Sequence, residues 1–116
     1  MLGDYQQTIS YCQEALALHL EYGNYQGAAD TWDSLGYAYH HLGRHAEAID
    51  CYEHALDTYR RADDLLSETT ALDHLGDTRH ALGNLREARE AWERAVSVLD
   101  DLRHPKADEL RNKLRH

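Results

Sequence analysis

Apolar and small residues recur every three or four positions along most of the chain, the spacing that places side chains on one face of an α-helix. Short segments rich in glycine, asparagine and aspartate interrupt this pattern, and such residues adopt the left-handed backbone that ends a helix. They are Gly23-Asn24, Gly43, Asp63-Asp64 and Gly83-Asn84. The pattern therefore predicts helices over residues 4–22, 25–42, 45–62, 66–82 and 85–101.

The first two predicted helices each have a continuous apolar stripe. In the first, the stripe consists of Tyr5, Ile9, Cys12, Leu16 and His19. In the second, it consists of Trp32, Leu35, Gly36, Tyr39 and Leu42. Glycine inside a helix costs about 1 kcal/mol relative to alanine. Gly36 therefore predicts that a neighbouring helix approaches closely at this point.

The chain repeats itself with a period of 40 residues and no gap. Residues 23–62 and 63–102 share ten identical positions, among them Leu42/Leu82, Gly43/Gly83, Glu47/Glu87 and Glu53/Glu93. The same shift aligns residues 3–22 with the second helix of a unit. We therefore expect the chain to begin within a repeat whose first helix precedes Met1, as in a piece of a longer array.

The spacing within each unit resembles that of the tetratricopeptide (TPR) repeat. The residues that carry the resemblance are Trp32, Leu35, Gly36, Tyr39, Ala48, Tyr52 and Ala55, and most recur as Leu72, Leu75, Gly76, Ala88, Trp92 and Ala95. The resemblance implies an all-α, right-handed α-solenoid of antiparallel helix pairs. The whole chain, 1–116, would be one TPR domain, with 3–22 as half a repeat, 23–62 and 63–102 as full repeats, and 103–116 as a capping helix.

The last full unit and the segment after it are more polar than the rest. Arg79 and Arg89 stand where the preceding unit has Tyr39 and Ile49, and their aliphatic stems can line the core while the guanidinium reaches water or an acid. Beyond them, Pro105 suits the start of a helix. Ala107, Leu110 and Leu114 form a short apolar stripe among mixed charges. This pattern favours a solubilising cap over a basic arm that binds nucleic acid.

The net charge is −9 and is unevenly distributed. Residues 1–102 contain seven basic and nineteen acidic side chains, whereas residues 103–116 contain five and two. An acidic body argues against nucleic-acid binding, because phosphate contacts need a basic face. It suits a basic protein or peptide partner, and it equally suits a role in solubility alone.

Several further features indicate where such a chain resides. Its longest apolar runs are only a few residues, so no membrane span is predicted. No signal peptide is recognisable at its start. Cys12 and Cys51 lack ligand or redox spacing, which favours buried free thiols in a reducing cytoplasm.

The sequence shows none of the common catalytic motifs. It has no glycine-rich phosphate loop, CxxC pair, HExxH helix or nucleophile elbow, so we predict neither an enzyme nor a bound cofactor. Nine histidines are present, but His41 and His45 lie on either side of Gly43 and are not a ligand pair on one helix. We predict no metal site. A weak metal or small-ligand sensor built around His40 and His80 is the least favoured reading.

The first helix of each TPR unit lines the concave face, so the resemblance also implies a binding surface. The predicted partner-binding residues on it are Asp30, Asp33, Tyr37, His40, His41, Asp73, His74, Asp77 and His80. Ser34 and Thr70 would lie on the same surface. This groove is acidic and rich in imidazole. TPR domains that clasp a C-terminal carboxylate use Lys, Arg and Asn at such positions, and these residues are absent from the set.

A closer resemblance comes from the blocks TWDSLGYAYHHLGRHAEAIDCYEHAL and ALDHLGDTRHALGNLREAREAWERAV. They are similar to the C-terminal repeats of actinobacterial antibiotic regulatory proteins, which carry DNA-binding, NB-ARC and TPR modules. Kinesin light chains and polarity adaptors with Leu-Gly-Asn repeats also use 40-residue units. The first resemblance implies a regulatory or sensor arm without DNA-binding or ATPase activity of its own.

Two functions therefore lead. The first is a protein–protein interaction scaffold, as the arm of a transcriptional regulator or as a stand-alone adaptor. The second is self-association through residues 4–22, because Ile9, Cys12 and Leu16 would be exposed where the preceding helix is missing. The coding sequence upstream of Met1 would separate a regulator, with a nucleotide-binding module, from an adaptor with TPR units alone.

Overall fold

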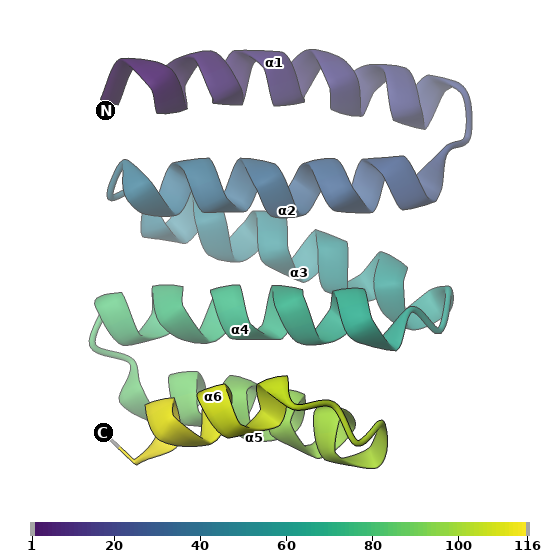
Figure 1. The fold of residues 1–116 in the computed structure, drawn as a ribbon. Helices are drawn as coiled ribbons and strands as arrows, with labels where there is room; N and C mark the ends of the chain where they lie inside the picture. Colours follow the sequence, from purple (N-terminus) through teal and green to yellow (C-terminus); the bar gives the residue numbers. More distant parts are fainter. Residues whose placement is uncertain (1, 116) are drawn as a thin grey trace.

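A computed structural model describes residues 2–115, which form six α-helices and no strand. They are α1 (Leu2–Glu21), α2 (Tyr25–His41), α3 (His45–Arg61), α4 (Leu65–Ala81), α5 (Leu85–Asp101) and α6 (Lys106–Leu114). Successive helices run antiparallel, and each packs on the next along the chain (Figure 1). Helices α2, α4 and α6 lie in one layer, with α3 and α5 behind them (Figure 1). The predicted all-α solenoid of helix pairs is confirmed.

The helix ends lie within about two residues of the predicted ones, because the turn residues act as expected. Gly23, Gly43 and Gly83 have φ angles of 70°, 77° and 82°, in the left-handed region that favours glycine. Asp64 caps α4, since its carboxylate accepts a hydrogen bond from the backbone N–H of Ser67. As a result α4 begins directly after Asp64, one residue earlier than predicted. His116, the last residue of the predicted cap, lies outside the described residues.

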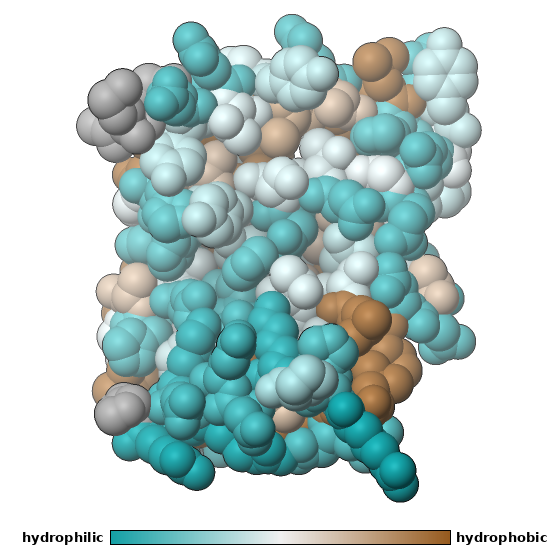
Figure 2. Space-filling view, in the orientation of Figure 1, coloured by the Kyte–Doolittle hydropathy of each residue, from teal (hydrophilic) through white to brown (hydrophobic). Residues whose placement is uncertain are grey.

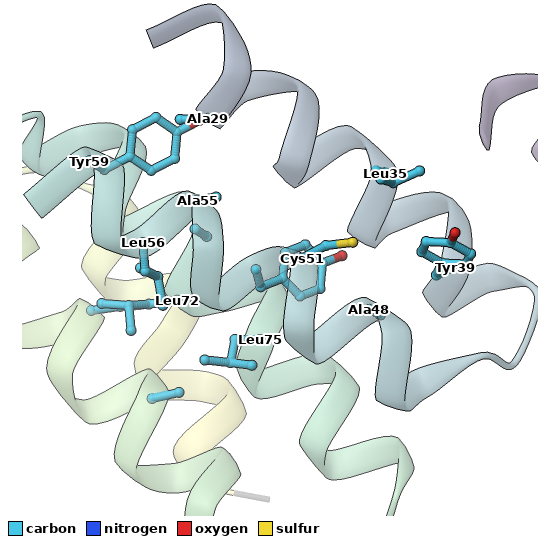
Figure 3. Close-up of a cluster of buried hydrophobic side chains, with 14 of the residues drawn as sticks. Ala29, Leu35, Tyr39, Ala48, Cys51, Ala55, Leu56, Tyr59, Leu72 and Leu75 are labelled. Carbon is cyan, nitrogen blue, oxygen red and sulfur yellow. The ribbon is translucent and has the colours of Figure 1, made fainter. Parts of the chain in front are cut away.

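Small residues in the core let the paired helices approach closely. Ala48 and Ala55 on α3 are fully buried, and Figure 3 shows them among side chains of α2, α3 and α4. A Cβ added to Gly36 would lie 2.7 Å from Cε1 of Tyr52 on the facing helix. Gly76 has the same relation to the indole of Trp92 one unit later. The packing reason predicted for Gly36 is therefore confirmed.

Helix α6 covers the end of the stack as the predicted cap. It begins at Lys106, directly after Pro105, and packs against α5 through the buried Ala107 and Leu110. The guanidinium of Arg79 lies 3.2 Å from the Glu53 carboxylate, and Arg89 donates a hydrogen bond of 2.6 Å to the Leu114 carbonyl. Each arginine thus extends its charged end to a polar partner at the edge of the core, as predicted for a long side chain at an apolar repeat position.

Helix α1 corrects one expectation from the sequence. Ile9 and Cys12 are buried and Leu16 is partly buried, so they are not the face left uncovered on this helix. Helix α2, which packs on α1, accounts for their burial. The large apolar residues exposed on α1 and directly after it are Tyr11 (75 %), Leu18 (54 %), Leu20 (48 %) and Tyr22 (79 %). None of the helices in residues 2–115 is both long and apolar enough to cross a membrane.

Candidate functional site

The nine predicted partner-binding residues all lie on α2 and α4. Residues three and four apart share one side of a helix, so the spacing of Asp33, Tyr37 and His40 places them together. The two helices contact each other, and Figure 2 views the layer that they form with α6. This view is mostly hydrophilic, with a hydrophobic patch at the lower right (Figure 2). We call the surface of α2, α4 and α6 the groove face.

A pocket of about 190 Å³ opens on the groove face between α2 and α4. Its lining residues are Tyr37, His40, His41, Tyr52, His74 and Asp77. Five of these six belong to the predicted set. The sixth, Tyr52, comes from α3 and is almost fully buried, which is why its apolar spacing placed it only in the core. We call this space the imidazole pocket.

The walls of the imidazole pocket are a row of aromatic rings. The centroids of Tyr37 and His41 are 4.2 Å apart, and those of Tyr37 and His74 are 5.8 Å apart. Tyr5 extends the row from α1, stacked on His41 at 5.2 Å. Tyr37 is 47 % exposed, although a large aromatic side chain gains by burial. The row therefore presents flat apolar surface to a molecule arriving at this face.

Three carboxylates of the groove face have basic partners within the chain. An oxygen of Asp33 lies 3.2 Å from Nδ1 of His74. The ammonium of Lys113, on α6, lies 2.6 Å from Asp73 and 2.9 Å from Asp77. Asp73 is only 9 % exposed, so most of its side chain is occupied by the contact with α6. Asp77 keeps 40 % of its side chain exposed.

The remaining predicted residues lie to either side of the imidazole pocket. Asp30 accepts a 2.5 Å hydrogen bond from the Tyr59 hydroxyl and lines a second pocket of about 260 Å³. Asp33, Ser34 and Thr70 share that second pocket. His80 is exposed and its ring lies 5.7 Å from that of Trp92, away from both pockets. The predicted set is thus divided between two pockets, a buried ion pair and an exposed histidine.

His40 and His74 of this face each form a hydrogen bond with another side chain, and their pKa values are shifted in opposite directions. Burial and the nearby His41 and His45 lower the pKa of His40, whose Nδ1 is 2.8 Å from the Thr78 hydroxyl. Burial also lowers the pKa of His74, but the hydrogen bond and charge of Asp33 outweigh it, so that this pKa is raised overall. His40 therefore favours the neutral form, and His74 is the imidazole here that gains from protonation.

Neither the histidines nor the cysteines form a metal centre in the part of the chain described. Within residues 2–115, no three His, Cys, Asp or Glu side chains are grouped so as to hold a metal ion. Cys12 and Cys51 are free and buried, as predicted. Burial and the charge of Asp50 raise the pKa of the Cys51 thiol to about 12, which keeps it in the unreactive protonated form.

Comparison with known proteins gives this arrangement a family. A sequence profile of the tetratricopeptide repeat matches residues 1–61 and again residues 27–101. The chain belongs to the TPR family. TPR repeats generally mediate protein–protein interaction and are typically scaffolds without catalytic activity. A search of curated proteins found no match to the chain.

Helix α2 packs on α3 and α4 packs on α5, and the imidazole pocket lies between α2 and α4. Sequence reasoning identified five of its lining residues from the resemblance to TPR units, whose first helices line the binding face. It missed Tyr5 and Lys113, which reach the groove face from α1 and α6. Tyr5 belongs to the apolar stripe of the first helix, and Lys113 lies beside Leu114 in the stripe of the last. These stripes predicted the two helices, but they did not predict that either side chain contacts the groove face.

Proposed function

We propose that this TPR domain is a protein–protein interaction scaffold and that its groove face binds a basic segment of the partner. The observation that carries the proposal is the imidazole pocket, where the aromatic rings of Tyr37 and His41 stay exposed on a mostly hydrophilic face (Figure 2). Exposed aromatic side chains beside charged ones are the usual anchors of protein interfaces. The acidic side chains around the pocket favour a partner of positive charge.

Selection of peptide ligands tests this function without a known partner. Random peptides displayed on phage would be selected on the wild-type chain, and their affinities would then be measured by calorimetry. We expect selected peptides to be rich in Lys and Arg, and Tyr37→Ala to weaken them about tenfold, as loss of one interface anchor does. Glu90→Ala is the control, because Glu90 is exposed on α5 in the layer behind.

Peptides that bind the wild type and Tyr37→Ala equally would place binding on another surface. Acidic peptides that depend on Tyr37 would retain the groove face as the binding surface but refute a basic partner. Raising the salt concentration adds a further check, since screening should weaken binding to an acidic surface.

We further propose that the domain is the regulatory arm of a larger bacterial transcriptional regulator. The support is the similarity of its 40-residue blocks to the C-terminal repeats of antibiotic regulatory proteins. Sequencing the coding region around this chain tests it. An upstream NB-ARC module would support the regulator, whereas flanking TPR units alone would favour a stand-alone adaptor.

A second role, self-association through α1, is favoured by the exposed Tyr11, Leu18 and Tyr22. The 40-residue shift equates Tyr11 with Cys51 and Ala91, and both of these are buried. Burial of each large side chain in a dimer contributes about 1.5–3 kcal/mol. We therefore expect a concentration-dependent homodimer in sedimentation experiments, abolished by the double substitution Tyr11→Glu and Leu18→Glu. A wild-type chain that stays monomeric at about 100 μM would refute this role.

A further inference from the structure

The groove face already holds one cationic group, the ammonium of Lys113. The Lys113 ammonium lies 2.6 Å from Asp73 and within 3.2 Å of both oxygens of Asp77. It also lies 5.9 Å from the centroid of the Trp92 ring, at the distance of a cation–π contact. Two carboxylates and one aromatic face thus bind a basic side chain between α4 and α6.

The imidazole pocket is the corresponding place one unit earlier. The 40-residue shift places Tyr52 at the position of Trp92, and Tyr52 lines the pocket. Here His74 takes the place of Lys113 as the basic partner of Asp33, the counterpart of Asp73, and about 190 Å³ stays open beside it. Asp77 belongs to both places, because its carboxylate touches Lys113 and also lines the pocket.

We propose that the imidazole pocket binds an arginine side chain of the partner, with its guanidinium stacked on Tyr37 and His41 and paired with Asp77. This inference rests on the proposed function of the groove face and names the chemistry that the face selects. The flat rings of the pocket suit a planar guanidinium better than a compact ammonium, because guanidinium stacks on aromatic faces. It also forms paired hydrogen bonds with a carboxylate.

The charges around the pocket agree with a cationic guest. The titratable side chains that line the pocket are Tyr37, His40 and His41 on α2, Tyr52 on α3, and His74 and Asp77 on α4. Tyr5 on α1, Asp33 on α2, His45 on α3 and Lys113 on α6 each contact one of these residues. These groups include two carboxylates and one ammonium, and His74 is paired with Asp33. Because Asp33 raises the pKa of His74, acidification adds positive charge on His74, and this charge would repel a guanidinium.

A short capped peptide tests the inference directly. Acetyl-Gly-Arg-Gly-amide would be titrated into the isotope-labelled chain while NMR follows the histidine and tyrosine rings. The citrulline peptide, which keeps the shape of arginine but is uncharged, is the matched ligand. We expect the arginine peptide to shift the rings of Tyr37, His41 and His74, and to bind about fivefold more tightly than the citrulline peptide.

Two variants locate the site. Tyr37→Leu should weaken the arginine peptide about fivefold, because it removes one aromatic face and keeps apolar volume. Tyr25→Leu, at the exposed start of the same helix and outside the imidazole pocket, should leave binding unchanged. Asp77→Asn should also weaken binding, and a melting curve would show whether the loss of its Lys113 contact alters the fold.

The pH dependence of the affinity separates an effect of charge from an effect of packing. Lowering the pH from about 7.5 to about 5.5 should weaken the arginine peptide severalfold as imidazoles become charged. The substitution His74→Gln should reduce that dependence, because Asp33 raises the pKa of His74. Equal affinity at the two pH values would overturn the inference, as would equal binding of the arginine and citrulline peptides.

These results separate the inference from the proposed function. If phage-selected peptides lose affinity on Tyr37→Ala but the arginine peptide does not bind the pocket, the groove face binds a partner by other chemistry and the inference fails. If the arginine peptide shifts rings outside the imidazole pocket, the inference fails as well. If selected peptides ignore Tyr37 altogether, the proposed function fails with it.

Discussion

The contact between Lys113 and the two aspartates provides the sharpest test of how the last helix is held. Lys113→Met removes the ammonium and keeps a side chain of similar length. Asp73, buried at 9 % exposure, would then lose its cation. Breaking a buried ion pair costs about 3–5 kcal/mol, whereas exposed pairs contribute about 0.2–1 kcal/mol.

The pair lies between these limits, because Asp73 is buried while the Lys113 side chain is 36 % exposed. Discounting for solvent screening, we expect Lys113→Met to lower the free energy of unfolding by about 1–2 kcal/mol. Asp73→Asn should cost a similar amount. The double variant should cost less than the sum, since the two residues share one interaction.

Urea melts followed by circular dichroism give these free energies. Lys106→Met is the matched control, because Lys106 lies on the same helix and forms no ion pair within the part of the chain described. The reasoning would be refuted if Lys113→Met cost no more than Lys106→Met. Strictly additive effects of Lys113→Met and Asp73→Asn would also refute it, because they would show that the two side chains do not interact.

Two further predictions concern stability. Gly36→Ala should destabilise the fold by about 1 kcal/mol, since overpacking against Tyr52 costs about 1–3 kcal/mol and better helix propensity returns about 1 kcal/mol; a urea melt showing net stabilisation would contradict the close helix contact. The raised pKa of His74 contributes stability that is fully present below the unfolded value near 6.5 and is lost as the pH rises through the folded value. His74→Gln should therefore cost more at about pH 5.5 than at about pH 8. The lowered pKa of His40 has the opposite sign, so wild type should lose stability relative to His40→Gln as the pH falls below about 6.5; parallel trends for the two variants would show that one sign is wrong.

The sequence by itself determined the helices and their pairing. A gap-free period of 40 residues, with glycine or aspartate at each turn, depends only on local backbone preference and on apolar spacing. Gly36 is an example, because glycine inside a helix has a cost that only close packing explains. The same register placed Tyr37, His40, His41, His74 and Asp77 on one face, and the structure brings them into one pocket.

Only the tertiary structure decided which of these side chains remain available to a partner. Asp33 and Asp73 occupy the same repeat position, yet Asp33 contacts a histidine of α4 and Asp73 a lysine of α6. Those contacts join residues about one full repeat apart, so they depend on how neighbouring helices are placed and not on local pattern. The same reason explains α1, where packing against α2 buries Ile9 and Cys12 and leaves Tyr11 exposed. Apolar spacing identifies a helix face, but only the neighbouring helix determines whether that face is covered.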